Sequence, residues 1–322
     1  MGEGTGVESR PPLVVIGGPT ASGKTAFSVR LALALEADGI PAEIISADSR
    51  QVYRGTDVAT AKPTLAERRG VPHHGLDLAD PDERFSVADF AAHVEVALAA
   101  IAAREGVAIL AGGTGFWLGA IADGLDLDAL PWDPAVRATL EVELAASGLG
   151  RLVERLWATA PGLASRVDLR NPRRVVRALE IATVAGDAPR PGPRGYPGPG
   201  LRLALDVADR SMHRTMIERR AAAQLDGGIL PEAEALRARY PTSLPAFSAI
   251  GYREAWDLLD GRIDRAAYLA ANAGRNMAYA RRQRTWFRRS PADLQVDAGD
   301  PGGIDRAIQH ARSFAARRGH GA

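Results

Sequence analysis

Short apolar runs alternate with longer helical segments over the first part of this chain. Residues 13–16 (LVVI) have the length and character of a buried strand, and residues 25–37 have the apolar spacing of a helix that Gly39 ends. Further strands are expected at residues 43–46 and 107–111. Strands that alternate with helices in this way predict a parallel α/β sheet.

The helix expected before the third of these strands has a clear start signal. Ser86 and Asp89 have the spacing of a capping box, and Gly106 is expected to stop the helix. The strand at residues 107–111 follows directly and ends in GGTGFW.

From about Pro131 the pattern becomes helical, at residues 133–148 and 171–186. The Pro/Gly-rich residues 188–200 read as a connection, and residues 201–207 resume the strand pattern. Further helices are expected at residues 212–225, 231–239, 252–259 and 265–289. The chain is therefore predicted to have a disordered tail (1–10), an α/β core domain (11–130 and 201–322, helical at its C-terminal end) and a small helical insertion domain (131–200).

The composition is that of a globular protein, with 322 residues, 46% hydrophobic and 25% charged. No apolar run is long enough for a membrane span, and the first residues do not have the pattern of a signal peptide. The absence of cysteine excludes disulfides and thiolate zinc sites. A cytoplasmic protein with no membrane partner is expected.

The net charge of +1 hides two clusters of arginine. One comprises Arg173, Arg174 and Arg177; the other comprises Arg281, Arg282, Arg284, Arg288 and Arg289. Aromatic residues interleave the second cluster, a pattern typical of nucleic-acid binding, although a solvated helix face explains such a run equally well.

One motif carries specific chemistry. Residues 18–25 fit G-x-x-x-x-G-K-[ST], a loop whose backbone N–H groups hold phosphates. Its members are Gly18, Pro19, Thr20, Ala21, Ser22, Gly23, Lys24 and Thr25. Lys24 would neutralise phosphate charge and Thr25 would place a hydroxyl on Mg²⁺. The alternative is a tight Gly-rich turn without a ligand.

Three strand ends are expected to meet at one edge of the sheet, at residues 17–25, 48–53 and 112–114. This edge is the candidate active site. Asp48 could be a metal ligand, the acceptor of a proton from a nucleophile, or a turn carboxylate. For the adjacent His73 and His74 a structural role is favoured over metal binding.

Taken together, seven blocks resemble the bacterial tRNA dimethylallyltransferases, also called tRNA isopentenyltransferases. They are GGPTASGKT, ISADSRQVYRGTDVATAKP, VPHHGLDLADPDERFSVADF, AGGTGFWLGAIADGL, RRVVRALEI, SAIGYREA and RRQRTWF, in the family's order. The resemblance implies a P-loop NTPase-like fold, a sheet flanked by helices. It also implies that the loop holds dimethylallyl diphosphate, with Mg²⁺, and that the prenyl group passes to the exocyclic N6 amine of adenosine 37 of tRNA, beside the anticodon.

The resemblance also assigns roles to residues. Asp48 matches the general base, Arg220 an arginine that acts with Lys24 on the departing diphosphate, and Thr20 a loop threonine near the reacting groups. The positions that match tRNA contacts, for a partner bound by its anticodon stem-loop, are Asp48, Ser49, Arg50, Gln51, Thr114, Arg137, Asn171, Pro172, Arg173, Arg174, Ser248, Ala249, Ile250, Gly251, Tyr252, Arg253, Arg281 and Arg282. A monomer is expected.

This chain departs from the family pattern at several positions. Asn171 replaces an Asp, Met216 an Arg, Asn276 and Met277 a Thr-Arg pair, and Trp117 a Tyr. Three other functions therefore remain open. They are a small-molecule kinase, a prenyltransferase for free adenine nucleotides, and a tRNA-binding protein without catalysis.

Overall fold

The computed structural model describes residues 10–127, 131–187 and 192–317. The chain divides into two compact units, residues 1–124 with 195–322, and residues 125–194. The sequence-based bounds of the insertion, 131–200, differ from those of the second unit by a few residues at each end. The tail expected at residues 1–10 lies outside the described residues except for Arg10, which pairs with Glu95.

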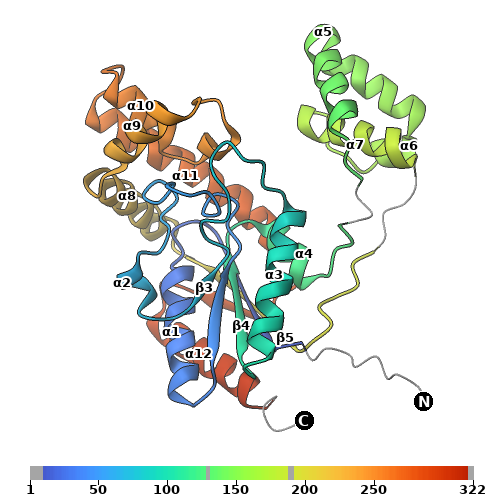
Figure 1. The fold of residues 1–322 in the computed structure, drawn as a ribbon. Helices are drawn as coiled ribbons and strands as arrows, with labels where there is room; N and C mark the ends of the chain where they lie inside the picture. Colours follow the sequence, from blue (N-terminus) through green and yellow to red (C-terminus); the bar gives the residue numbers. More distant parts are fainter. Residues whose placement is uncertain (1–9, 128–130, 188–191, 318–322) are drawn as a thin grey trace, which may run out of the picture. The chain divides into compact units, whose positions relative to one another are not determined.

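The first unit contains a parallel six-stranded sheet in the order β3-β2-β4-β1-β5-β6 (Figure 1). The strands are β1 (Leu13–Gly17), β2 (Ala42–Ser46), β3 (His73–His74), β4 (Val107–Gly112), β5 (Gly200–Asp206) and β6 (Leu294–Asp297). The expected parallel α/β architecture is thus confirmed. β3 and β6 were not expected, because two- and four-residue edge strands have too little pattern to be distinguished from loops.

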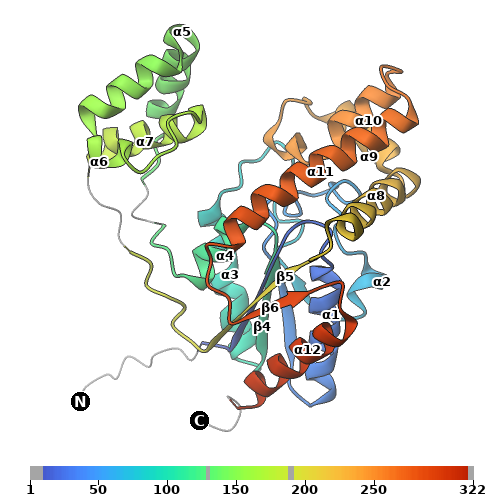
Figure 2. The same cartoon turned by 180° about the vertical axis from the view of Figure 1, so that it is seen from behind.

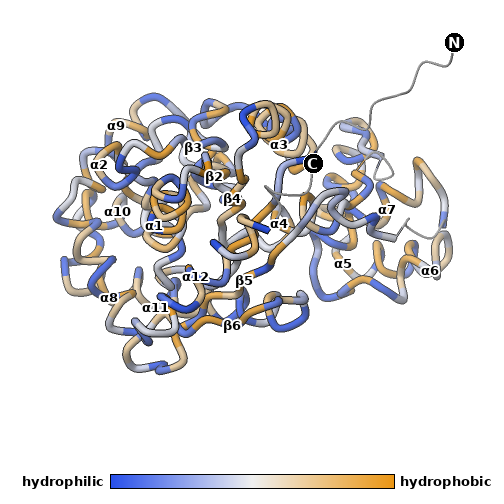
Figure 3. The backbone as a smooth tube through the Cα atoms, turned by 90° about the horizontal axis from the view of Figure 1, so that it is seen from below, coloured by the Kyte–Doolittle hydropathy of each residue, from blue (hydrophilic) through white to orange (hydrophobic). Residues whose placement is uncertain are grey.

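Helices cover both faces of the sheet (Figure 3). α1 (Lys24–Ala37) and α12 (Pro301–Ala316) pack on one face, against Val14, Ile16 and Ile109. α3 (Val87–Ala102) and α4 (Gly115–Ala122) pack on the other. The strands are buried on both faces, which explains their continuous apolar runs.

Local signals set most helix ends. Ser86 and Asp89 form the expected capping box of α3. The helix ends at Ala102, before the expected stop at Gly106, because residues 103–105 form turns and Glu105 already has a left-handed backbone (φ 54°).

A helical group stands over the carboxyl edge of the sheet (Figure 2). It consists of α8 (Arg210–Asp226), α9 (Ile229–Arg239), the 3₁₀ turn η1 (Pro245–Ser248), α10 (Tyr252–Leu259) and α11 (Arg265–Phe287). α8 packs along α11, and a short helix α2 (Leu65–Arg68) follows the loop after β2. The helical group of α8 to α11 thus brings residues from the C-terminal part of the chain to the edge of the sheet where the phosphate loop begins.

The second unit is helical, with its own apolar core. It contains α5 (Pro134–Thr159), α6 (Pro161–Ala164) and α7 (Pro172–Ala185). Gly148 interrupts α5 with φ 76° and ψ 171°. In the described residues of both units, no helix is long and apolar enough to cross a membrane.

Candidate active site

The phosphate loop, residues 18–25, joins β1 to α1. Gly18 passes so close to β5 that a Cβ atom would lie 2.1 Å from the carbonyl oxygen of Leu205. Gly23 precedes α1 in a left-handed conformation (φ 78°), which L side chains rarely adopt. Both glycines of the motif are therefore required by the backbone path itself.

Lys24 extends back over this loop, and its Nζ donates to the carbonyl oxygen of Pro19 at 2.7 Å. Burial lowers the pKa of Lys24 to about 8, against an opposing effect of the Asp48 carboxylate. The cation is therefore held where its charge is poorly solvated, so an anionic ligand would restore its ordinary protonation.

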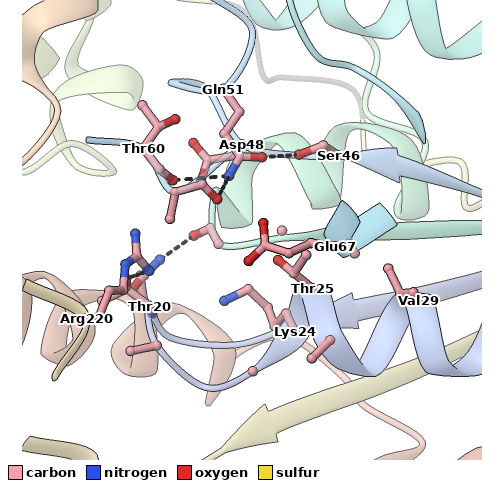
Figure 4. Close-up of a pocket in the computed structure, with 18 of the residues that line it drawn as sticks. Thr20, Lys24, Thr25, Val29, Ser46, Asp48, Gln51, Thr60, Glu67 and Arg220 are labelled. Atoms are coloured by element: carbon pink, nitrogen blue, oxygen red, sulfur yellow. Dashed lines mark hydrogen bonds between the residues drawn. The ribbon is translucent and has the colours of Figure 1, made fainter. Parts of the chain in front are cut away.

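Asp48 has one of the roles considered for it, that of a turn carboxylate. Its Oδ1 accepts a hydrogen bond from the backbone N–H of Arg50 at 2.9 Å, as a turn carboxylate does. The same carboxylate favours the charged forms of Lys24 and Arg220, and so partly opposes the burial that lowers the pKa of both. The turn fixes the carboxylate on the wall of the cavity that both cations also line (Figure 4).

Arg220, from α8, reaches the same place. Its Nη1 donates to the hydroxyl of Thr20 at 3.0 Å, and burial lowers its pKa, with Asp48 opposing. Its Nε is buried and has no hydrogen-bond partner in the described part of the chain. A buried N–H without a partner, beside a phosphate loop, fits an anionic ligand.

Two cavities adjoin at these residues. The first, about 520 Å³, is lined by five residues of the loop, Thr20, Ala21, Gly23, Lys24 and Thr25. The second, about 340 Å³, lies toward η1 and α11. The residues common to both are Thr20, Asp48, Thr60, Arg220 and Tyr279. The carboxylate and the loop threonine thus stand between a phosphate-binding space and a second space.

Many of the expected tRNA contacts line the second cavity. They are Asp48, Ser49, Arg50, Ser248, Ala249, Ile250 and Arg282. Three segments far apart in the sequence are therefore brought to one space.

Two expected contacts lie elsewhere. Gln51 is buried on the wall of the first cavity, where its Nε2 donates to the carbonyls of Thr60 and Ala61 and its Oε1 accepts from Ser46. The side chain of Tyr252 is completely buried in the core. The prediction that Tyr252 contacts RNA directly is therefore wrong.

The other expected contacts of the first unit do not line either cavity. Thr114 accepts from the backbone N–H of Ser49 at 3.2 Å and so fixes the turn after β2. Gly251 is buried with φ 119°, whereas Arg253 and Arg281 are exposed.

The second unit carries the remaining expected contacts. Arg137 pairs with Glu141 and with the buried Glu180. Asn171 caps α7 by accepting from the backbone N–H of Arg174, and Pro172 occupies the first turn. Arg173 and Arg174 are exposed. Asn171 therefore performs the capping role that an Asp would also perform.

The structure shows what Met277, Asn276 and Trp117, three of the departures from the family pattern, contact. Met277 packs beside Ile217 and Ala280. Asn276 lines the second cavity and donates to Asn272, and Trp117 is buried in the core.

The histidine pair joins the edge of the sheet. His74 Nε2 contacts Glu43 on β2 at 2.6 Å, and His73 Nδ1 contacts the carbonyl of Val71. Arg104 pairs with the same Glu43. These contacts give the pair a structural role.

Sequence reasoning missed three residues of the site. Gln283 accepts from the backbone N–H of Thr20 at 2.7 Å and donates to the carbonyl of Gly113 at 2.9 Å. Tyr279 lies on the wall of both cavities, and burial followed by Asp48 raises its pKa to about 12. His213 is completely buried and contacts the carbonyl of Thr20. For Gln283, the available sequence signal was a glutamine flanked by arginines within the sequence of one helix.

The fold and the site define a P-loop α/β protein, in which the loop after β1 and an aspartate after β2, two strands away in the sheet, line one cavity. The IPP transferase family model matches residues 51–290. The chain belongs to this family of tRNA dimethylallyltransferases.

Individual relatives agree. The chain is 45% identical to a tRNA dimethylallyltransferase of Anaeromyxobacter dehalogenans, over 86% of this chain and 90% of the relative. It is 41% identical to one of Stenotrophomonas maltophilia, over 88% and 91%. The crystal structure of the full-length tRNA isopentenylpyrophosphate transferase of Bacillus halodurans is 35% identical, with a TM-score of 0.68 over 95% of this chain and 96% of that chain. A eukaryotic dimethylallyltransferase acting on tRNA shares the fold, with a TM-score of 0.78 at 22% identity.

Proposed function

We propose that this protein transfers the dimethylallyl group of dimethylallyl diphosphate to the N6 amine of adenosine 37 of tRNA, releasing diphosphate. The observation that carries the proposal is the pair of adjoining cavities that share Asp48, Thr20 and Arg220. A transfer reaction needs a donor and an acceptor on two sides of one reacting centre, and this arrangement provides both.

The first cavity suits the diphosphate. Loop amides, Lys24 and Arg220 supply positive charge, and the unpartnered Nε of Arg220 supplies a further donor. Negative charge accumulates on the diphosphate as the bond between carbon 1 and oxygen breaks. Fixed donors placed there stabilise the transition state more than the ground state.

The second cavity suits the adenosine, which must leave its stack to react. Its N6 amine attacks carbon 1 of the dimethylallyl group, forming the new carbon–nitrogen bond. We assign to Asp48, which lines both cavities, the role of accepting the proton that the amine loses. Exposed Arg281 and Arg282 on α11 provide charge for the RNA backbone.

The donor set fits Mg²⁺ held mainly by its substrate. The described residues contain no group of three or more His, Cys, Asp or Glu that could hold a metal ion. Mg²⁺ in such sites takes few protein ligands and completes its shell with phosphate oxygens and water. The Thr25 hydroxyl in the first cavity is the ligand we assign. When bound, Mg²⁺ neutralises the charge on the leaving diphosphate.

The reaction is assigned to a monomer because residues of one chain line both cavities. It is assigned to the cytoplasm, where tRNA is available as a substrate.

The test uses the purified protein with dimethylallyl diphosphate, Mg²⁺ and unmodified tRNA that bears adenosine 37. Nucleoside mass spectrometry is expected to find N6-(dimethylallyl)adenosine, and none with a tRNA that bears guanosine 37. Asp48→Ala is expected to remove the product while tRNA still binds. Equal loss of product and tRNA binding in Asp48→Ala would argue against the general-base role. Product formed from free AMP but not from tRNA would show that the acceptor is a free adenine nucleotide. ATP consumption without prenylation would favour a kinase.

A further inference from the structure

Three polar groups of Thr20 are bound by side chains from the helical group. Its backbone N–H donates to Gln283 Oε1 at 2.7 Å, and its hydroxyl accepts from Arg220 Nη1 at 3.0 Å. Its carbonyl oxygen lies 2.8 Å from Nε2 of His213. Thr20 lies between the two cavities, so α8 and α11 determine where this part of the phosphate loop sits.

The neighbours of His213 determine its tautomer. Arg284 Nη2 lies 2.5 Å from Nδ1 of the imidazole. A guanidinium can only donate, so Nδ1 must be the unprotonated nitrogen. A carbonyl oxygen can only accept, so Nε2 must carry the proton that it donates to Thr20. The ring is therefore neutral, with its proton on Nε2.

Arg284 is in turn oriented by Asp206 at the end of β5. Its Nε donates to the two carboxylate oxygens of Asp206, at 2.8 and 2.9 Å. Arg210, on the same helix as His213, also pairs with Asp206. Burial lowers the pKa of His213, and the hydrogen bond to the Thr20 carbonyl opposes this effect. Arg284 and Arg210 lower the pKa further, and Asp206 raises it. The net effect, set first by burial, disfavours the cation of the ring.

We propose that His213 is a positioning residue for the transfer reaction, which holds the carbonyl of Thr20 so that the threonine hydroxyl stays on Arg220. Successive hydrogen bonds from Asp206 to Arg284 to His213 link β5 and α11 to the loop. His213 does not line either cavity, so it acts on the reactants only through Thr20. The proposal rests on the proposed function for its effect on rate.

Replacement of His213 should lower kcat rather than substrate affinity. Lys24, the loop glycines and the arginines of α11 stay in place when the histidine is replaced, so substrate affinity is largely retained. A displacement of about 1 Å at a reacting centre costs up to about 100-fold in rate.

Two amide substitutions provide a matched pair. A glutamine places its amide nitrogen close to the position of Nε2, whereas an asparagine is one carbon shorter and reaches only the Arg284 side. His213→Gln is expected to keep kcat within about threefold, the size of one weakened hydrogen bond. His213→Asn is expected to lower kcat about 10- to 100-fold. The tRNA dissociation constant and the melting temperature should be the same in both variants. Equal kcat in the two variants, or a loss of tRNA binding that matches the loss of kcat, would overturn the proposal.

A second measurement does not depend on activity. Nitrogen-15 NMR of protein labelled at histidine is expected to show, at pH 7.5, a protonated Nε2 and an unprotonated Nδ1 for His213. Arg284→Met should remove this fixed tautomer. A cationic ring or a proton on Nδ1 in the wild-type protein would refute the network even if the asparagine variant does not fold. An inactive wild-type protein with the expected tautomer would instead refute the proposed function and leave the network intact.

Discussion

Glu232→Ala should destabilise the first unit by detaching the segment that follows β2. Glu232, on α9, accepts hydrogen bonds from the backbone N–H groups of Asp57, Val58 and Ala59 at 2.9, 2.6 and 3.1 Å. It also accepts from the hydroxyl of the buried Tyr252 at 2.8 Å. One carboxylate thus joins α9, α10 and the segment at residues 57–59.

The magnitude follows from these contacts. A hydrogen bond to a charged group contributes about 1.5 to 3 kcal/mol, but four that share one acceptor do not add. Asp57 is exposed, so its N–H can turn to water, whereas Tyr252 and Ala59 are buried and would lose their partner outright. Gln224 still binds the carbonyls of Val58 and Ala59. Leaving each of the two buried donors, on Tyr252 and Ala59, without a partner costs about 1 to 3 kcal/mol, so we expect a loss of about 2 to 6 kcal/mol in the free energy of unfolding.

Urea unfolding measures this loss. Glu234→Ala is the matched control, because Glu234 is exposed on the same helix and should change stability by less than about 0.5 kcal/mol. The m-value should stay constant while the midpoint of Glu232→Ala falls. If the two variants unfold at the same midpoint, the carboxylate does not hold the segment and the reasoning from these contacts is wrong.

Three other predictions concern RNA, metal and pH. Replacing Arg281 and Arg282 together by Gln should weaken tRNA binding and reduce the slope of log K against log salt by about 1.4, at about 0.7 for each phosphate contact. Filter binding measures the slope, with Arg306→Gln on α12 as the control. A slope unchanged and equal to that of the control would mean that the two arginines belong to a solvated helix face. Thr25→Val should raise the Mg²⁺ concentration needed for half-maximal prenylation at least about tenfold, since loss of even an outer-shell partner of a metal costs about 10- to 100-fold. An unchanged Mg²⁺ titration would remove Thr25 as a ligand. Because the pKa of His213 is lower in the folded protein than its ordinary 6.5, the unfolded chain binds more protons and stability falls as pH drops below about 6.5. His213→Gln should make the thermal midpoint fall less steeply between pH 6.5 and 5, and equal slopes would contradict the pKa direction.

The sequence by itself determined features that depend on neighbouring residues. The strand, phosphate loop and first helix follow from an apolar run, two glycines and a lysine within residues 13–25, and the structure places them there. The helix at residues 252–259 has the expected ends, and the capping box at Ser86 forms. These features rest on backbone conformation and apolar spacing, which a few adjacent residues encode.

The tertiary structure alone decided which of these features meet. The strand order β3-β2-β4-β1-β5-β6 sets Asp48 beside the phosphate loop, and the helical group sets Arg220 and Gln283 on Thr20. It also turned Tyr252 into the core, where its hydroxyl donates to Glu232. No local pattern carries such information, because the partners are separated by up to 263 positions and meet only when the sheet and the helices over its edge have packed.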